Sequence, residues 1–335
     1  MIRSRGQCSG APQVLQKSSY QHRPVLLEES VALLDLEPGA IVVDGTVGGG
    51  GHAAALLERI GPSGRLVGLD VDDEALAEAG RRLGHPDDPR VTLVRASFRE
   101  LHRVLADLGI AAIDGLLLDL GVSSRHLDSA ERGFRFSEDT AGMTPLDMRM
   151  DRRTDATAAD LLRTASAPEL ERWFREYGEL PGAPRLARAI VEARRRAPLQ
   201  TAGDLVAVVR EARVGGGRRH HPATLVFQAL RIALNDELGA LTDGLDAALD
   251  ALRPGGRVAV IAYHSLEDRV VKTRLRAEER GCVCPPRLPV CVCGRVPRVR
   301  VLTRRPIGAG DDEIRGNPRA RSARLRGAER SGEAA

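Results

Sequence analysis

The sequence has few aromatic residues and almost no lysine. Phe, Trp and Tyr make up 3% of the 335 residues, and Lys17 and Lys272 are the only lysines among 50 basic residues. No run of about 18 apolar residues is present, which excludes a predicted transmembrane helix. Residues 1–21 lack the apolar core of a signal peptide. We therefore expect a protein that is neither secreted nor embedded in a membrane, with a disordered arm over residues 1–21.

Arginine supplies nearly all of the positive charge. The formal net charge is +4 and the sequence pI is about 9.0, which permits a polyanionic partner without requiring one. The excess of Arg fits either a compositional bias of the source genome or bidentate recognition of phosphates. With 42% apolar residues, the chain can bury a sizeable core, in one large domain or two moderate ones.

A glycine-rich turn near the N-terminus organises the predicted fold. Residues 41–44 indicate a buried strand, residues 45–51 a tight turn and residues 53–58 the start of a helix. Such a turn exposes backbone N–H groups at a helix N-terminus and lets a ligand approach the main chain closely. The alternative is an ordinary strand–helix connection with a capping aspartate.

Strands and helices then alternate, which predicts a doubly wound, Rossmann-like parallel sheet of the α/β class. Further strands are expected at 65–70, 91–96, 113–121, 257–263 and 299–303, and helices at 73–83, 101–108 and 223–252. Five cysteines in a fold of this nucleotide-binding type point to the cytoplasm, where thiols stay reduced.

The alternation stops between residues 135 and 222, where charges and helical periodicity dominate. We interpret residues 135–222 as a helical insertion that recognises the substrate, within a sheet domain formed by residues 22–134 and 223–310. Candidate helices of the insertion lie at 158–163, 168–177, 184–196 and 202–212. Residues 311–335 are predicted to be an Arg-rich tail that either contacts a polyanion or is merely solvated.

Acidic residues end three of the predicted strands. Asp44, Asp70 and Asp119 would face one crevice, because ligands of such sheets bind outside the carboxyl ends of the strands. Dinucleotide sites prefer Gly-x-Gly-x-x-Gly, and the absence of a Walker lysine disfavours a nucleotide-phosphate site. An acid placed before the glycines instead favours S-adenosylmethionine, with Asp70 spaced to accept hydrogen bonds from the ribose diol.

His264 follows the expected strand 257–263 and would face the same edge of the sheet, where it could act as a general base. A Ser-His-acid hydrolase is disfavoured, because the sequence has no Gly-x-Ser-x-Gly motif. The alternative for this segment is a turn in which Ser265 caps a helix.

Four of the five cysteines form two Cys-x-Cys pairs, Cys282 with Cys284 and Cys291 with Cys293. Four thiols in a compact hairpin can bind zinc tetrahedrally, although Cys-x2-Cys is the usual spacing. The pairs therefore predict either a zinc site or four reduced thiols in a loop. The histidines are scattered and indicate no other metal site.

Several stretches together resemble the bacterial ribosomal RNA small subunit methyltransferase H family, also called MraW. The clearest is Asp44-Gly45-Thr46-Val47-Gly48-Gly49-Gly50-Gly51-His52. The others occupy residues 22–27, 118–124, 145–151, 221–224, 227–232, 264–269 and 317–323, in that order along the chain. Departures from the family pattern fall at 140–144, 178–184 and Leu225, mostly in the insertion.

The resemblance implies methyl transfer from S-adenosylmethionine to the exocyclic N4 amine of a cytidine in the decoding centre of 16S rRNA, within the small ribosomal subunit. A homodimer is an alternative to a monomer. Asp119 and His264 are the candidates for accepting the proton of the amine. The resemblance carries cofactor contacts over to Gly50, Gly51, His52, Asp70, Phe98 and Asp119. Asp44 is added from its strand-end position, and His126 stands where the family usually has Gln.

The alternative is a methyltransferase acting on a DNA or protein amine. DNA amino-methyltransferases carry Asp/Asn-Pro-Pro-Tyr/Phe after the fourth strand, whereas this chain has Asp119-Leu120-Gly121-Val122. An RNA-binding scaffold that uses only its basic tail is disfavoured by the intact strand-end acids and glycines.

Overall fold

The computed structural model describes residues 24–122, 129–135, 142–215, 222–285 and 290–332. Their strands form one seven-stranded sheet in the order β3-β2-β1-β4-β5-β7-β6. The strands are β1 (Ile41–Asp44), β2 (Arg65–Asp70), β3 (Val91–Arg95), β4 (Ile113–Asp119), β5 (Leu252–Ala262), β6 (Val299–Val301) and β7 (Arg324–Arg330). Strands β1 to β5 are parallel, and β7 runs antiparallel to both of its neighbours. The predicted doubly wound α/β class is confirmed.

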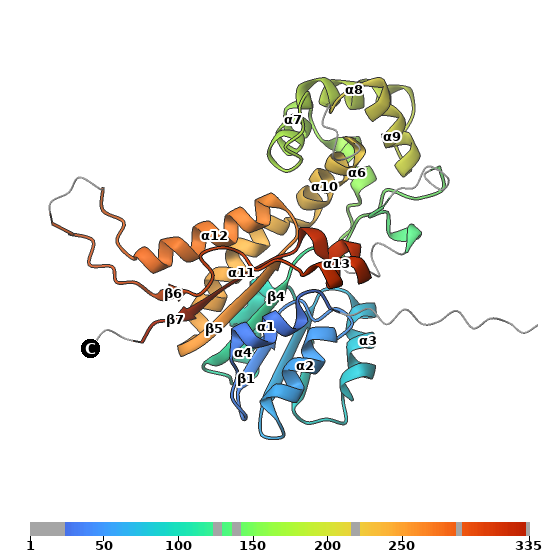
Figure 1. Ribbon diagram of the computed structural model, residues 1–335. Helices are drawn as coiled ribbons and strands as arrows, with labels where there is room; N and C mark the ends of the chain where they lie inside the picture. The colour runs from blue at the N-terminus through green and yellow to red at the C-terminus, as the bar shows by residue number, and fades with distance from the viewer. Residues whose placement is uncertain (1–23, 123–128, 136–141, 216–221, 286–289, 333–335) are drawn as a thin grey trace, which may run out of the picture.

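Helices cover both faces of the sheet (Figure 1). Consecutive strand residues point to opposite faces, so Val42 and Val43 of β1 enter different cores. Val42 packs with the helices of one face, α1 (Leu27–Leu34), α2 (Gly51–Ile60) and α3 (Asp73–Leu83). Val43 packs with those of the other, α4 (Leu101–Asp107), α11 (Glu237–Ala251) and α12 (Ser265–Arg280). Burial on both faces explains why these strands read as continuous apolar runs.

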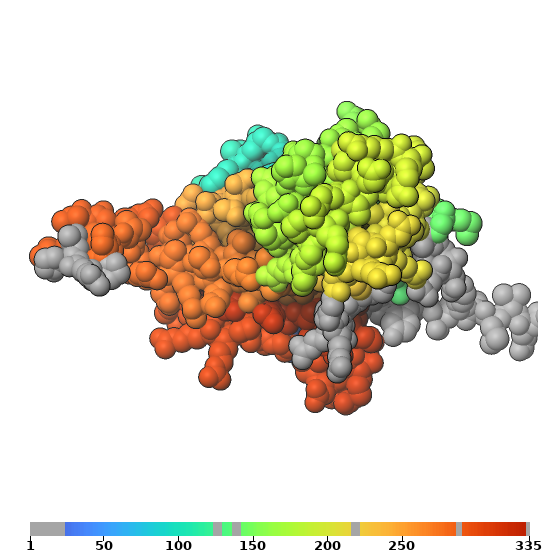
Figure 2. Space-filling view, turned by 90° about the horizontal axis from the view of Figure 1, so that it is seen from above, coloured from blue at the N-terminus to red at the C-terminus, as the bar shows by residue number. Residues whose placement is uncertain are grey.

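The insertion has a hydrophobic core of its own. Its helices are α6 (Ala158–Thr164), α7 (Ala167–Glu176), α8 (Ala183–Arg196), α9 (Ala202–Glu211) and α10 (Pro222–Asn235). They pack around Phe174, and the core begins at Phe134 and continues to Leu230. The structure therefore corrects the predicted boundary at residue 222, because the apolar face of α10 is buried against the insertion and not against the sheet. Figure 2 shows the insertion, in green and yellow, as a distinct mass beside the rest of the molecule.

The predicted single helix over 223–252 is wrong. The chain breaks between α10 and α11 at Asp236, which adopts the left-handed conformation with φ 47° and ψ 43°. Aspartate tolerates this conformation better than most residues. Asn235 secures the break, because its Oδ1 accepts from Met150 N at 2.8 Å and its Nδ2 donates to Met148 O at 2.9 Å. The turn redirects the chain from the insertion to the sheet.

The predicted Arg-rich tail is also corrected. Residues 311–332 form α13 (Asp311–Gly316), a 3-10 turn (Pro318–Ser322) and β7, which lies between β5 and β6. Leu325 and Ala328 are fully buried, and Arg326 donates to Asp268 of α12 at 2.6 and 3.2 Å. The sequence did not indicate this strand, because its arginines suggested a solvent-exposed segment. Arg326 is instead a buried ion-pair partner.

Several predicted features lie outside the described residues. These are the arm over residues 1–21, the proposed cofactor contact His126 and the serine pair at 123–124. Within the described part of the chain, no helix is both long enough and apolar enough to cross a membrane.

Candidate functional site

The predicted strand-end acids meet at one edge of the sheet. Strand β1 lies between β2 and β4, so Asp44 is flanked by the strands that end in Asp70 and Asp119. Burial is the main cause that raises the pKa of Asp44, and the charges of both neighbouring carboxylates add to it. The edge is therefore rich in hydrogen-bond acceptors and negative charge.

The glycine-rich turn is fixed to the strands on both sides of it. Gly48 N donates to Asp70 Oδ2 at 2.9 Å, and Val47 N donates to Leu69 O at 2.8 Å. On the other side, Asp119 N donates to Thr46 Oγ1 at 2.6 Å. The turn is thus held rigidly in place before any ligand arrives.

Gly50 and Gly51 serve close packing as well as exposing backbone. Gly50 has a φ of +76°, and a Cβ there would lie 3.2 Å from Ala79 of α3. A Cβ on Gly51 would lie 2.4 Å from Pro24 Cγ. Neither position tolerates a side chain without displacing a neighbour, so these glycines also seat α3 and the segment that begins at Pro24.

Asp44 is a buried carboxyl group with one unsatisfied oxygen. Its Oδ1 accepts from Thr46 N at 3.2 Å, while Oδ2 has no hydrogen-bond partner in the described part of the chain. The residue is 1% exposed, and this burial is the main cause that raises its pKa to about 7. A positively charged or hydrogen-donating ligand group beside Oδ2 would supply the missing hydrogen bond and would stabilise the ionised form of the buried carboxyl group.

Asp119 is partly exposed and contacts two neighbouring side chains. Its side chain is 26% exposed, Oδ1 accepts from Tyr263 OH at 2.8 Å, and Oδ2 lies 3.6 Å from His52 Nδ1. His52 Nε2 donates in turn to Val25 O at 3.0 Å. Burial and the charge of Asp119 raise the pKa of Tyr263, so the phenol keeps its proton and remains a donor to Asp119.

His264, predicted as a general base, begins α12 as its N-cap residue. Its Nδ1 accepts from Glu267 N at 3.4 Å, and its Nε2 lies 3.1 Å from Glu267 Oε1. With Nδ1 acting as acceptor, the neutral ring carries its proton on Nε2. His264 itself, and not the alternative Ser265, is the cap. The arrangement favours a positioning role for His264 over proton transfer.

A buried ion-pair network lies behind His264. Arg231 of α10 donates to both oxygens of Glu237 at 2.8 and 2.9 Å. Burial opposes ionisation of Glu267, but the contact with His264 and the charge of Arg231 hold the pKa of Glu267 below its usual value. Glu237, His264 and Glu267 are close enough to bind a metal ion. The guanidinium of Arg231 already supplies the compensating positive charge, so we interpret the group as an ion-pair network.

Phe98 forms part of the wall beside the glycine turn. It opens a short 3-10 turn, in which Ser97 and Glu100 make a reciprocal capping box. A Cβ on Gly45 would lie 3.2 Å from Phe98 Cβ, and one on Gly244 would lie 2.3 Å from its ring. The ring is therefore packed closely against α11.

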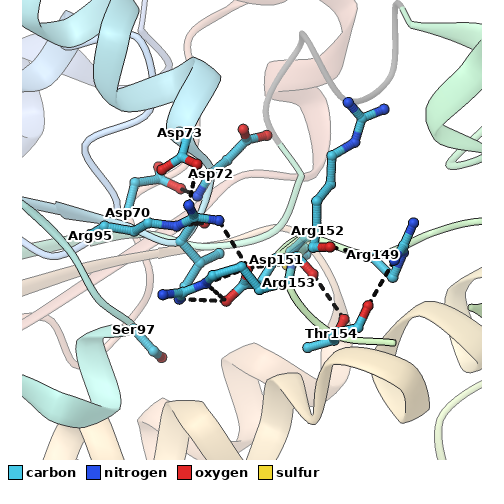
Figure 3. Close-up of polar contacts among 12 residues, drawn as sticks. Asp70, Asp72, Asp73, Arg95, Ser97, Arg149, Asp151, Arg152, Arg153 and Thr154 are labelled. Carbon is cyan, nitrogen blue, oxygen red and sulfur yellow. Dashed lines mark hydrogen bonds and ion pairs between the residues drawn. The ribbon is translucent and has the colours of Figure 1, made fainter. Parts of the chain in front are cut away.

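Ion pairs dock the insertion beside Asp70 (Figure 3). Arg95, the last residue of β3, contacts Asp73 and donates to Asp151 Oδ1 at 3.1 Å. Asp151 is also bound by Arg153, and this hydrogen bond is the main cause that lowers the pKa of Asp151 to about 2. Asp70 itself accepts from the backbone N of Asp72 at 2.9 Å, so the predicted ribose-binding residue lies next to these docking contacts.

A buried pair strengthens this docking. Arg132 is 3% exposed and donates to Asp72 Oδ2 at 2.9 Å and to Arg149 O at 3.0 Å. A second attachment joins Glu179 of the insertion to α12, where Ser265 Oγ donates at 2.9 Å and Arg269 at 3.0 Å. The stretch 145–151, recognised in the sequence only by resemblance, thus belongs to a docking loop.

Sequence reasoning missed several residues of the site. Tyr263 was visible only as a phenol next to His264, and Thr46 only as a residue inside the glycine turn. Arg132 gave no local signal, because its partner Asp72 is remote in the sequence. Glu267 follows His264 by three residues, the spacing of a capping box, and this local signal could have identified it.

A model of the MraW methylase family matches residues 19–331, which confirms the resemblance. A ribosomal RNA small subunit methyltransferase H from Heliobacterium modesticaldum is 51% identical over 314 residues, covering 93% of this chain and 99% of that protein. The protein of that name from Syntrophus aciditrophicus is 52% identical over 316 residues, covering 94% and 98% of the two chains. A solved rRNA methylase from Streptococcus thermophilus is a distant likeness, with a TM-score of 0.39 and 12% identity over 91% of this chain and 94% of that one. This chain belongs to the MraW methylase family, and S-adenosylmethionine is its methyl donor.

Proposed function

We propose that this chain transfers the methyl group of S-adenosylmethionine to the exocyclic N4 amine of a cytidine in the decoding centre of 16S rRNA, within the small ribosomal subunit. The names of relatives that are 51% and 52% identical in sequence support small-subunit rRNA as the substrate. The acceptor-rich edge of the sheet at Asp44 and Asp119 supports an amine as the substrate group, because an amine must lose a proton when it gains a methyl group.

The residues of the crevice fit the donor. When bound, S-adenosylmethionine supplies a methyl group on a positively charged sulfonium. The unsatisfied Oδ2 of Asp44 suits a ligand that brings positive charge or hydrogen-bond donors. We assign the donor site to Asp44, Asp70, Asp119, His52 and Phe98, with the backbone at Gly50 and Gly51. His126 remains a predicted contact.

The hydrogen bond between Tyr263 and Asp119 is the observation that carries the proposal. A cytosine amine is weakly nucleophilic, so it must be held in line with the methyl group and relieved of its proton. Asp119 is partly exposed at the crevice and can accept that proton. Tyr263 fixes the orientation of the carboxylate through Oδ1. We assign proton acceptance to Asp119 and a positioning role to His264.

The cysteines of the described residues argue for nitrogen over carbon as the methylated atom. Methylation at a cytosine ring carbon uses a thiol nucleophile. Each cysteine that the structure describes lies between residues 282 and 293, beyond the far end of α12 from His264. The crevice built by the described residues therefore offers a carboxylate and no thiol.

The insertion supports a large, structured substrate. Its docking loop is held at the carboxyl ends of β2 and β3, next to the donor crevice. A cytidine must be unstacked to enter such a crevice, and a separate domain beside it can hold the flanking nucleotides. A DNA or protein amine is the alternative substrate, and the experiment below distinguishes it.

The test is a methyl-transfer assay with radiolabelled S-adenosylmethionine. The purified chain is offered unmethylated small subunits, naked 16S rRNA, DNA and a mixture of proteins, and the labelled product is digested and identified by chromatography. We expect label in N4-methylcytidine from small-subunit rRNA. Asp119→Asn should abolish transfer, whereas Asp107→Asn, on the exposed surface of α4, should not. Label in 5-methylcytidine, DNA or protein would contradict the proposal.

A further inference from the structure

The loop between α12 and β6 brings four thiols together at the molecule's edge. Helix α12 ends at Gly281, and Cys282 and Cys284 follow it, while Cys291 and Cys293 precede β6. The loop projects from the end of the molecule opposite the insertion (Figures 1 and 2). The four sulfur atoms lie within 4.8 Å of one another.

The spacing of these sulfur atoms is that of a tetrahedral metal site. Cys291 Sγ lies 3.5 Å from both Cys282 Sγ and Cys293 Sγ, and 3.8 Å from Cys284 Sγ. Cys293 Sγ lies 3.8 Å from Cys282 Sγ. Zinc bound to four thiolates at about 2.3 Å requires sulfur atoms roughly 3.8 Å apart. A disulfide would instead bring two of them to about 2.05 Å.

Hydrophobic packing does not explain why the thiols converge. Val283 and Val292, the central residues of the two Cys-x-Cys pairs, are 61% and 78% exposed. Val290 and Val296 nearby are 70% and 59% exposed. In an extended chain, residues i and i+2 share one side and the residue between them faces the other. Each pair therefore turns two thiols inward and a valine outward, which gives the loop a sulfur centre in place of an apolar one.

The surrounding groups suit a negatively charged metal–thiolate centre. Val292 N donates to Cys284 Sγ at 3.4 Å, an interaction that stabilises a metal-bound thiolate. Arg280 and Arg295 flank the two pairs in the sequence and supply positive charge. Among the residues that the structure describes, no carboxylate belongs to the group of potential ligands at this centre.

We propose that Cys282, Cys284, Cys291 and Cys293 bind one structural zinc ion. Four protein ligands complete a tetrahedral site, so the ion holds the loop and has no open position for catalysis. The site lies beyond the C-terminal end of α12, whereas His264 caps the N-terminal end. A helix of 16 residues is roughly 24 Å long, so zinc acts far from the donor crevice.

The experiment measures metal in the full-length chain, without reference to methyl transfer. The untagged protein is purified under reducing conditions from zinc-supplemented cells, dialysed and examined by elemental analysis. We expect about one zinc per chain. Cobalt replacement under anaerobic conditions should give the absorption bands of tetrahedral cobalt tetrathiolate, and zinc should displace the cobalt.

Variants show which thiols are ligands. Cys284→Ser and Cys291→Ser should each weaken metal binding by more than about 100-fold, since loss of even a group that only hydrogen-bonds to a metal ligand costs about 10- to 100-fold. Cys8→Ser changes the remaining cysteine of the chain and should leave the metal content unchanged. Affinity for S-adenosylmethionine should be the same in all three variants.

Two results would overturn the proposal. One is wild-type protein that holds no zinc and gives no cobalt–thiolate absorption. The other is metal that stays bound when Cys284 and Cys291 are both replaced. Because metal content is measured without any RNA substrate, failure here leaves the proposed methyl transfer untouched, and the reverse also holds.

Discussion

Tyr263 donates a 2.8 Å hydrogen bond to Asp119 across the adjoining ends of β5 and β4. The pairing of the two strands places Asp119 opposite Ile261, two residues before the tyrosine. The contact therefore depends on the register of the sheet. It couples the proposed proton acceptor to a phenol that burial keeps protonated.

Replacing Tyr263 with Phe should slow methyl transfer while leaving donor affinity nearly unchanged. The variant loses one hydrogen bond to a charged group, worth about 1.5–3 kcal/mol, so the rate should fall by roughly 10- to 100-fold. Single-turnover transfer and calorimetric donor binding measure the two effects separately. Tyr177→Phe removes a hydroxyl from the insertion as a control. An undiminished rate in Tyr263→Phe would show that orientation of Asp119 by the phenol is unimportant.

Asp44 should make the ligand-free protein less stable as the pH rises. Its pKa is 3.8 in the unfolded chain and about 7 in the folded one, so folding favours the protonated form. The stability contribution is complete below pH ~4 and is lost as the pH passes through ~7. Each tenfold change in proton affinity is about 1.4 kcal/mol, which gives a loss on the order of 4 kcal/mol.

Urea unfolding between pH 4 and 8 checks this effect. Asp44→Asn should remove most of the decline in stability that the wild type shows over this range. Asp107→Asn, at an exposed position on α4, is the matched control and should follow the wild type. Identical pH profiles for Asp44→Asn and the wild type would contradict the buried, unsatisfied state of this carboxyl group.

Arg132→Met should destabilise the protein by about 3–5 kcal/mol. The side chains of Arg132 and Asp72 are 4% and 7% exposed, and removal of Arg132 takes the guanidinium away from the buried carboxylate of Asp72. Arg103→Met, in a pair with a 56% exposed arginine, should cost less than about 1 kcal/mol. Denaturant unfolding compares the two variants. An equal loss of unfolding free energy in the two variants would mean that the docking of the insertion does not depend on the buried pair.

Deletion of all residues after Gly310 should prevent stable folding. The truncation removes β7 from between β5 and β6 and leaves Asp268 without Arg326. We expect loss of both cooperative unfolding and donor binding, measured by circular dichroism and calorimetry. A control that lacks only residues 333–335, beyond β7, should behave as the wild type. Donor binding by the longer truncation would restore the interpretation of this segment as a tail.

Local pattern in the sequence was enough to place β1 to β4 and the acids that end three of these strands, whereas β5 begins at Leu252, before the predicted start at residue 257. Apolar runs mark strands buried on both faces, and glycines mark the turn after Asp44. Because the carboxyl ends of parallel strands share one edge, we could expect Asp44, Asp70 and Asp119 to meet from their positions at strand ends. The family resemblance then identified the donor, which the residue pattern had only favoured.

Tertiary structure decided what each polar group does. Arg326 pairs with Asp268 across 58 residues and Arg132 with Asp72 across 60, and no local periodicity records such partners. The pair of Arg326 with Asp268 belongs to a segment that the sequence indicated as a basic tail and that the structure shows as a strand between β5 and β6. The cap of α12 is different, because His264 contacts Glu267 only three residues away, and the local capping-box spacing records this contact. The periodicity of apolar residues indicates which side of a helix or strand is buried. The partner of a buried charge, in contrast, depends on how whole helices and strands are arranged in space.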